Sequence, residues 1–491
     1  MSEQRHSIKR QVIELTVRDA AHADRLHDEV SRIYRQRIVP LIDRCCSELS
    51  APDQLDRIER LELDLGAIDE RHLEAELVAR VRAALRPALA AQIAAQDASG
   101  RSSRATAWLE LLALFARTGS LPWWADAATP QLLENGLRYL LANAADPLRG
   151  LMRRLAGEPN SLQRLVDHLP DDVLVLLAAA LAPAVGAPLA EQLLALLVLL
   201  RDTPAVVGWG PARLRRSAWG AILRVAGTAG SQHTSAAPFY QSVLRRVAAE
   251  RGIRYDTLRA DLLAALERAS AERPNDALLA ELERASVERP NDALLAEQIQ
   301  ARAARQQRPD VPPAADDALD IEFDDADALY IGNAGLVILW PFLPDFFARL
   351  GLLAGERFTG LAAQQRAVGL LQHIASGDTT FAEYLLPLNK LLCGLEPDAV
   401  FDFGEPLEDA ETAACAEFLG AVIAQAPILR NMSLPGFRGT FLLRQAALSA
   451  RDGAWLLRVE RQTYDLVLDR FPWGWEWLRL PWMDAPLRVE W

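Results

Sequence analysis

Residues 173–190 read VLVLLAAALAPAVGAPLA, an apolar run of 18 residues that ends at Glu191. Its length alone approaches the roughly 20 apolar residues of a membrane-spanning helix. However, Pro183, Gly186 and Pro188 interrupt the run, and each of them disfavours a continuous helix. The pattern therefore predicts two buried helices joined by a turn, with a membrane span as the alternative.

The same Leu- and Ala-rich pattern extends outward from this run, so residues 105–264 are predicted to form a helical middle region. Two stretches interrupt it, residues 121–124, which read LPWW, and residues 227–231. The first is predicted to be a turn whose tryptophan pair fills a local core, with a docking element as the alternative.

Residues 265–327 are predicted to hold a repeat followed by a linker. Residues 266–281 read LERASAERPNDALLAE, and residues 282–297 repeat them with a single substitution. Two copies are too few for a solenoid, which needs about three or more. A segment that accepts such an insertion is not part of a tightly specified core. Residues 316–327 carry seven acidic residues and no basic one, which is typical of a solvated linker.

The N-terminal residues 1–96 are predicted to form a small β-α-β-α unit. Leu61, Leu63 and Leu65 alternate with acidic residues, as in a half-buried strand that ends at Gly66. The predicted elements are a β-leaning stretch at 8–17, an amphipathic helix that begins at Asp19 and stops at Ser50, a strand at 61–65, and a helix at 69–96.

The C-terminal residues 328–491 are predicted to form a helical segment followed by a Trp-rich, β-containing segment. Six of the twelve tryptophans fall between Trp455 and Trp491. A binding interface and a small aromatic core are equally consistent with this clustering. Short β-like runs lie at 455–460, 464–468 and 487–491. The predicted fold class is thus mainly α, with small α+β units at the N- and C-terminal ends.

The charge pattern argues against several functions. The net charge is −13 and the pI about 5.2, whereas a nucleic-acid-binding protein usually carries a basic patch. Lys9 and Lys390 are the only lysines, and neither follows a glycine, so no phosphate-binding P-loop exists. Lys390 is predicted to be a lone exposed lysine, with a polar anchor formed by Asn389 and Lys390 as the alternative.

No catalytic, cofactor or metal site is predicted. The chain lacks a Cys-x-x-Cys pair, a His-Glu-x-x-His motif and a Gly-x-Ser-x-Gly elbow. With four cysteines and no apolar leader after the first residues, a reducing cytosol is the expected compartment. We therefore expect a soluble protein that is not an enzyme.

Several short segments form an ordered set along the chain, namely residues 6–11, 45–49, 58–66, 118–124, 332–337, 340–343, 388–394, 471–473 and 480–483. Together they resemble one family, the tape-measure proteins of bacterial extracellular contractile injection systems, which are phage-tail-like particles. Residues predicted to contact partners are Leu121, Pro122, Trp123, Trp124, Gly332, Asn333, Gly335, Trp473 and Trp482. For residues 332–335, a simple turn and a close approach to a partner backbone are both open.

The resemblance implies a structural protein that sets the length of the particle's tube during assembly. Its implied partners are tube, baseplate or cap proteins and a cargo, and its implied location is the bacterial cytoplasm, then the released particle. A ruler confined to residues 105–328 would span about 330 Å if wholly helical. The acidic residues 316–327 are predicted to be a plain linker, with a segment that repels or selects a tube wall as the alternative.

Three other functions remain open. A cytosolic assembly chaperone or adaptor that never enters the particle would also suit the acidic charge and the globular ends. A membrane-active component would use residues 173–190, and an enzyme with dispersed catalytic residues comes last.

Overall fold

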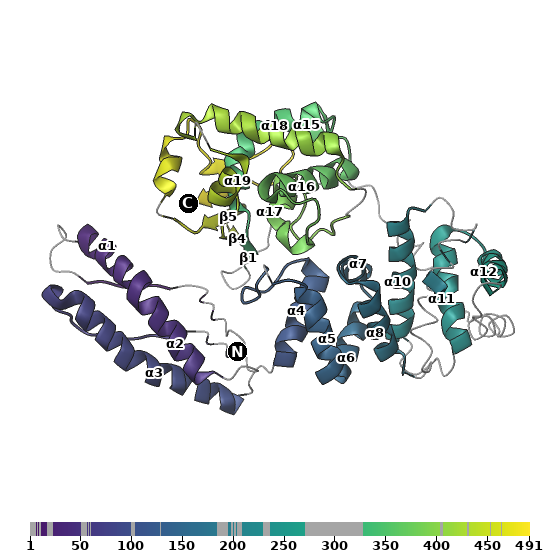
Figure 1. The fold of residues 1–491 in the computed structure, drawn as a ribbon, viewed down its shortest axis with the longest axis horizontal. Coiled ribbons are helices and arrows are strands. Elements are labelled where there is room, and N and C mark those ends of the chain that lie inside the picture. Colours follow the sequence, from purple (N-terminus) through teal and green to yellow (C-terminus); the bar gives the residue numbers. More distant parts are fainter. Residues whose placement is uncertain are drawn as a thin grey trace. The chain divides into compact units, whose positions relative to one another are not determined.

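A computed structural model of the chain shows two compact units, Met1–Leu111 and Leu112–Trp491 (Figure 1). The structure describes residues 6, 8, 11–16, 23–50, 56, 58, 60–99, 104–127, 129–183, 195–197, 200, 203, 209–228, 236–270, 328–402, 406–429, 432–451, 453–462 and 464–491. The predicted repeat after Ser270 and the acidic linker lie outside these residues. Most of the described chain is helical, which confirms the predicted fold class.

The first unit is built on a pair of helices. One helical stretch comprises α1 (Ala23–Ile33), the π-helical turn η2 (Tyr34–Ile38) and α2 (Val39–Leu49), and α3 (Leu73–Ser99) packs against it. A 3₁₀ turn, η3 (Glu70–His72), leads into α3, where the Asp69 side chain accepts the Arg71 N–H. Pro40 has no N–H to donate, and the Val39 N–H bonds to Tyr34 O, which widens the helix by one residue.

The buried core of this unit is a single stripe between the helices. Its members are Val30, Ile33, Ile38, Leu41, Cys45, Leu73, Leu77, Val81, Leu85 and Leu89. Both predicted helices are thus confirmed over the described residues, while the predicted cap at Asp19 lies outside them.

The strands predicted in this unit were wrong for the described residues 11–16 and 61–65. Leu61, Leu63 and Leu65 are half-buried against the helical core and their acidic neighbours are exposed, so the alternation itself is present. The backbone nevertheless forms no ladder, because a strand also needs a neighbouring strand to bond its N–H and C=O groups. Alternating polarity therefore indicates only which side chains of an extended segment face the core.

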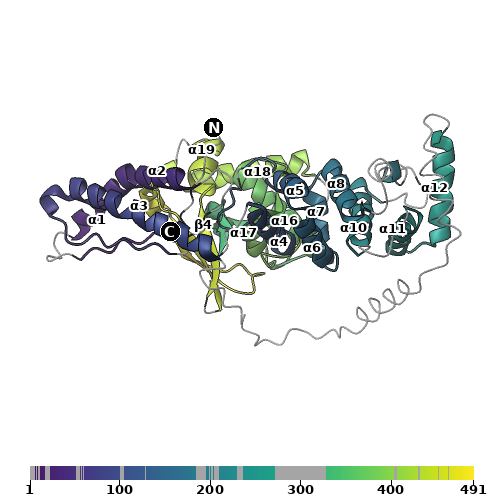
Figure 2. The same ribbon diagram turned by 90° about the horizontal axis from the view of Figure 1, so that it is seen from below.

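The helical region of the second unit, residues 112–270, consists of short helices packed on one another (Figures 1 and 2). They are α4 (Arg104–Thr118), which begins in the first unit's range, α5 (Leu132–Asn143), α6 (Ala145–Leu155), α7 (Pro159–His168), α8 (Asp171–Leu181), α10 (Pro211–Thr228), α11 (Ala236–Arg251) and α12 (Tyr255–Ser270). Helix α10 contacts α6, α7, α8 and α11, and its Trp219 is fully buried. The predicted helical pattern of the middle is confirmed.

Helix α8 forms the first half of the long apolar run. It ends at Leu181, just before Pro183, as predicted, and residues 184–190 lie outside the described part. Among the described helices, none is both long enough and apolar enough to cross a membrane.

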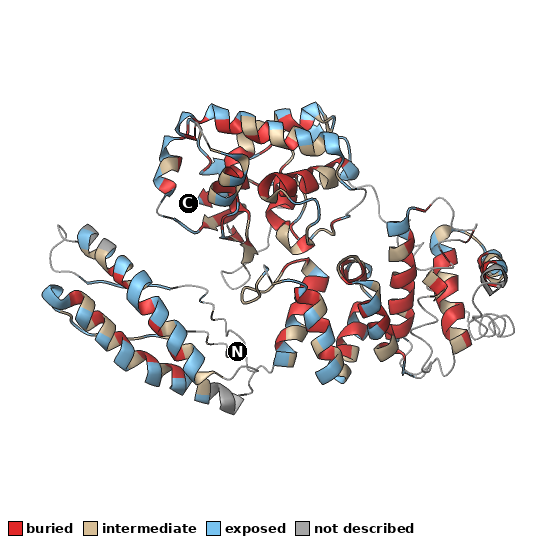
Figure 3. Ribbon diagram, viewed as in Figure 1, coloured by how far each residue is buried: buried red, intermediate tan, exposed pale blue. Residues whose placement is uncertain are grey.

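The C-terminal domain, residues 328–491, packs helices against a small mixed sheet. Its helical elements are η7 (Ala334–Phe342), α15 (Leu343–Arg349), α16 (Leu361–Ser376), η8 (Glu383–Leu385), α17 (Pro387–Leu392), α18 (Asp409–Gln425), η9 (Pro427–Leu429), α19 (Leu434–Phe437), η10 (Arg438–Leu442) and η11 (Asp465–Arg470). Figure 3 shows α16 and α17 largely buried beside the sheet.

The sheet has the strand order β1-β4-β5-β7-β6, with β5 and β7 parallel and the other pairs antiparallel. Its strands are β1 (Leu329–Ile331), β4 (Ala446–Arg451), β5 (Ala454–Val459), β6 (Trp477–Leu478) and β7 (Leu487–Glu490), and a separate hairpin joins β2 (Leu353–Ala354) to β3 (Arg357–Phe358).

Two of the three predicted β-runs are confirmed by β5 and β7. The third, at 464–468, was wrong, because Asp465 opens the 3₁₀ turn η11 and accepts the Gln462 N–H. The Ala-rich strand β4 was not predicted, since AALSAR favours a helix by local propensity.

Candidate functional site

The centre of the site is the Glu383 carboxylate, which is 1% exposed at the start of η8. Its Oε1 atom accepts hydrogen bonds from Lys390 Nζ at 2.8 Å, Arg164 Nε at 3.1 Å and the Phe401 N–H at 3.2 Å. Arg164 lies in α7 of the helical region, whereas the other groups belong to the C-terminal domain. A carboxylate buried with two cations is therefore shared between two regions of the second unit.

Arg164 also contacts the end of α4. Its Nη1 donates to Ala116 O at 3.1 Å and to Arg117 O, and its Nη2 donates to Asp398 O. The carbonyls at a helix C-terminus have no partner inside the helix and carry a partial negative charge, so a guanidinium is stabilised there.

Gly119, which follows α4, makes room for this contact. Its φ is +72°, a conformation that other residues rarely adopt. A Cβ atom at this position would lie 2.7 Å from Glu383 Oε1 and 3.1 Å from Arg164 Nε. The turn after α4 can therefore close over the ion pair only with glycine at this position.

His168, one turn along α7 from Arg164, forms a second link. Its Nε2 atom accepts the Glu383 N–H at 2.9 Å, so the proton of the neutral ring is assigned to Nδ1, which donates to Arg164 O at 2.9 Å. Burial lowers the pKa of His168 and favours this neutral form. The ring also packs edge-on against Phe115, with ring centres 4.8 Å apart.

Lys390 is 1% exposed, so the prediction of an exposed lysine was wrong. It lies on α17, every residue of which is buried. Burial lowers the pKa of Lys390, while the neighbouring Glu383 carboxylate opposes that shift. The apolar neighbours on α17 carry the lysine into the interior, where Glu383 and Pro397 O receive its hydrogen bonds.

Asn389, the neighbour of Lys390, belongs to a buried amide network. The Nδ2 atom of Asn333 donates to Asn389 Oδ1 at 2.7 Å and to Gln372 Oε1 at 2.8 Å. This network ties the start of η7 to α16 and α17. The polar-anchor alternative therefore describes Asn389 and Lys390 better than a lone exposed lysine does.

Gly335 lies directly against the backbone of the same chain. A Cβ atom there would be 1.7 Å from Phe441 O, whereas at Gly332 the nearest atom is Gln445 Nε2 at 3.7 Å. A close backbone approach at 332–335 is thus present, and it is made within the chain.

The two predicted tryptophans anchor the C-terminal segment. Trp473 Nε1 donates to Ile338 O at 2.9 Å and its ring packs edge-on against Phe342, while Trp482 Nε1 donates to Leu392 O at 2.9 Å. Of the six clustered tryptophans, Trp477 is the most exposed, at 58%.

Leu121, Pro122, Trp123 and Trp124 form the turn after Gly119 and are all partly buried. The structure thus brings this turn next to the Glu383 cluster, and gathers Gly332, Asn333, Gly335, Trp473 and Trp482 in the C-terminal domain. Their contacts with partners stay predictions. The sequence analysis missed Arg164, His168 and Glu383, because no local pattern links residues more than 200 positions apart.

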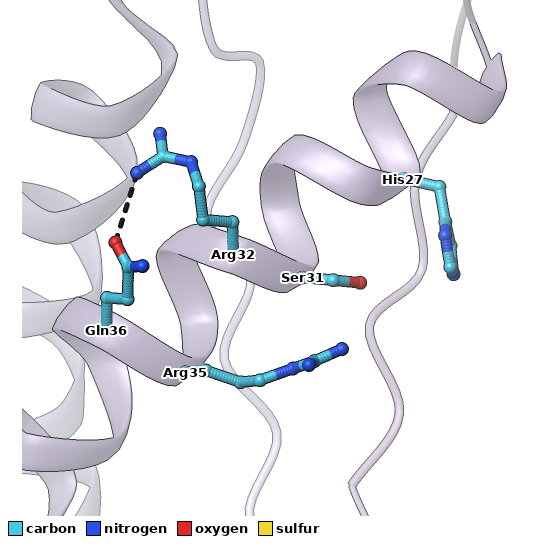
Figure 4. A pocket seen from close by; sticks show the side chains of 5 residues that line it. All are labelled: His27, Ser31, Arg32, Arg35 and Gln36. Atoms are coloured by element: carbon cyan, nitrogen blue, oxygen red, sulfur yellow. Dashed lines mark hydrogen bonds between the residues drawn. The ribbon is translucent and has the colours of Figure 1, made fainter. Parts of the chain in front are cut away.

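An open hollow on the first unit does not show comparable chemistry among its described lining residues. His27, Ser31, Arg32, Arg35 and Gln36 line this hollow of about 240 Å³ (Figure 4). Arg32 already bonds to Gln36 at 3.2 Å and to Glu74 at 3.0 Å. Within the described residues, no three His, Cys, Asp or Glu side chains are grouped to hold a metal ion.

The chain was compared with protein families, curated proteins and solved structures. The family model described as "Contractile injection system tape measure protein" matches residues 5–491. No curated protein and no solved structure matches this chain.

Proposed function

The chain belongs to the contractile injection system tape measure protein family, and we propose that it sets the length of the particle's tube during assembly. The observation that carries the proposal is the match over residues 5–491, which includes the helical middle and both ends. As a component of such a particle, the chain interacts with other particle proteins. We infer that tube, baseplate or cap proteins are these partners, with cargo as a further candidate.

The ruler is assigned to the middle of the chain. Residues 105–328 would span about 330 Å as one helix, at 1.5 Å per residue. In the described part of this region, short helices pack on one another instead. Length measurement by extension therefore requires α4–α12 to unpack from their folded arrangement.

Deleting residues 266–281 tests the ruler directly. We expect particles shorter by about 24 Å if the deleted copy is helical in the tube. A third copy should lengthen the particle by the same amount, and a scrambled copy of equal length should change nothing. Electron microscopy of purified particles measures this, and an unchanged length after the deletion would exclude a ruler in this segment.

A second function, an assembly chaperone or adaptor that is not incorporated, is favoured by one observation. The helices of residues 112–270 are folded into the same compact unit as the C-terminal domain, rather than extended. Both functions place the chain in the bacterial cytoplasm during assembly. Mass spectrometry of purified particles separates them, because only a tape measure should be present, at few copies, in the released particle.

A further inference from the structure

Polar contacts join the helical region to the C-terminal domain, beside one aromatic contact in which the ring centres of Phe115 and Tyr384 lie 6.2 Å apart. Arg164 and His168 bond to Glu383, and Arg216 Nη2 of α10 lies 2.6 Å from Asp402 Oδ1. Among the described helices and strands, every pair that packs extensively lies within one region. Interfaces between parts of a chain that are small and polar resemble transient interfaces. We call the contacts of Arg164, His168, Arg216, Glu383 and Asp402 the Glu383 junction.

Breaking a buried ion pair is normally unfavourable, because one charge is left in the interior without a partner. In the Glu383 junction, the charge that belongs to the C-terminal domain would not be left without a partner. If Arg164 leaves, Glu383 keeps the Lys390 ammonium at 2.8 Å and the Phe401 N–H at 3.2 Å. The carboxylate therefore stays neutralised by a cation of its own domain.

If the two regions separate, the charged residues of the helical region likewise keep hydrogen-bond partners within that region. Arg164 retains the carbonyls of Ala116 and Arg117 at the end of α4. Arg216 retains Asp167, whose Oδ1 lies 2.8 Å from its Nε. Asp402, which loses Arg216, is already 57% exposed to water. Each bridging charge thus has a second partner in its own region, or water, when the two regions separate.

A buried pair inside the C-terminal domain shows the contrast. Arg444 and Asp465 form two bonds of 2.6 and 2.8 Å, and both residues belong to the same domain. No other cationic side chain bonds to Asp465 in the described part of the chain. Removal of Arg444 would leave the Asp465 carboxylate without a cation, so separation of this pair is unfavourable.

We propose that the Glu383 junction is a reversible contact that opens while both regions stay folded. The opened chain would remain continuous through residues 271–327, with its helical region released from the C-terminal domain. This inference concerns the free protein and does not depend on the length-setting role. Particle length tests the length-setting role, whereas amide exchange tests the reversible contact. Either proposal can therefore fail without the other.

Hydrogen exchange of three amides in the full chain tests the proposal. The Glu383 N–H bonds across the junction to His168, the Lys390 N–H bonds to Leu386 O within the domain, and the Leu169 N–H bonds to Leu165 O within the helical region. We expect the Glu383 amide to exchange at least about tenfold faster than the other two, with little dependence on urea, because opening exposes little surface. Equal rates with equal urea dependence would overturn the proposal.

Two substitutions sharpen the test. Arg164→Met should accelerate exchange at Glu383 at least about tenfold, with Lys390 and Leu169 amides within about twofold of their rates in the unmodified chain. The matched control is Arg215→Met, since Arg215 bonds to Asp171 and to two carbonyls entirely inside the helical region. It should leave the Glu383 rate unchanged.

Lys390→Met separates an opened junction from a weakened domain. It removes the cation that stays with Glu383, so exchange at Glu383 and at position 390 should accelerate together. If Arg164→Met also accelerated both sites, or if it changed neither, Lys390 would not be the retained partner and the proposal would be wrong.

Discussion

The first unit and the C-terminal domain bury their side chains in different ways. In the first unit, a single apolar stripe lies between the α1–α2 stretch and α3, and the extended segments beside it form no ladder in the described residues. In the C-terminal domain, helices and a five-stranded sheet enclose a core from several sides, together with the Asn333 amide network. Figure 3 shows the contrast as a narrow buried stripe against a largely buried interior.

This difference indicates that precise side-chain packing matters more in the C-terminal domain than in the first unit. Two helices can bury only the faces they turn toward each other, so most of their remaining surface stays in water. A core enclosed on several sides leaves no direction in which a side chain can move away. We therefore expect small changes of shape to be costly in the C-terminal domain and tolerated across much of the first unit.

The largest effect is expected from Gly335→Ala. Since the new Cβ would lie 1.7 Å from Phe441 O, backbone must move, and we expect a loss of more than about 4 kcal/mol in the free energy of unfolding. Gly332→Ala is the matched control, with its nearest atom at 3.7 Å, and should cost less than about 1 kcal/mol. Urea unfolding followed by tryptophan fluorescence measures both, and similar losses would break the comparison.

A smaller effect is expected from Leu85→Ala in the first unit. Leu85 is buried in the stripe, so its truncation should cost about 2–4 kcal/mol, and hydrogen exchange should show lost protection in α1–α3 alone. The half-buried Leu65 is the control, and Leu65→Ala should cost about 1 kcal/mol. Lost protection in the C-terminal domain as well would mean that the two cores do not unfold separately.

The smallest effect concerns pH. Burial lowers the pKa of His168, so the folded chain keeps the ring neutral while the unfolded chain binds a proton below about pH 6.5. The unfolded state then binds more protons, and stability should fall as the pH falls below that value, by at most about 1.4 kcal/mol per pH unit. In the folded chain Arg164, Lys390 and Glu383 surround this ring.

His168→Gln should reduce that slope, because an amide oxygen can accept the Glu383 N–H without titrating. Urea midpoints of the second unit between pH 7.5 and 5, compared with those of the unmodified chain, measure the difference. An identical slope in both chains would show that His168 does not contribute.

Much of the fold could be predicted because helical periodicity is local. A few neighbouring residues predict the end of α8 at Leu181 before Pro183, the end of α2 at Leu49, and strand β5. The strands at 11–16 and 61–65 were predicted by the same local rule and are absent. Alternating polarity specifies an extended chain, whereas a strand depends on a second segment to complete its hydrogen bonds.

The candidate site shows the same limit. Residues 118–124, 332–337, 388–394 and 480–483 resemble the family by their amino acids alone, and in the fold they lie around the Glu383 cluster and in the C-terminal core. The roles of Arg164 and Glu383 could not be read from their neighbours. A charged residue in a helix is usually exposed to solvent. It becomes buried only where another part of the chain packs over it.

The sequence alone thus determined the helical middle, the apolar helix faces and the family resemblance, because each depends on side chains within a few turns of one another. Tertiary structure alone decided that Lys390 is buried, that Gly335 meets the Phe441 backbone and that Glu383 is shared between Arg164 and Lys390. Burial and charge pairing depend on which surfaces meet in space, and surfaces hundreds of residues apart leave no periodic signal along the chain.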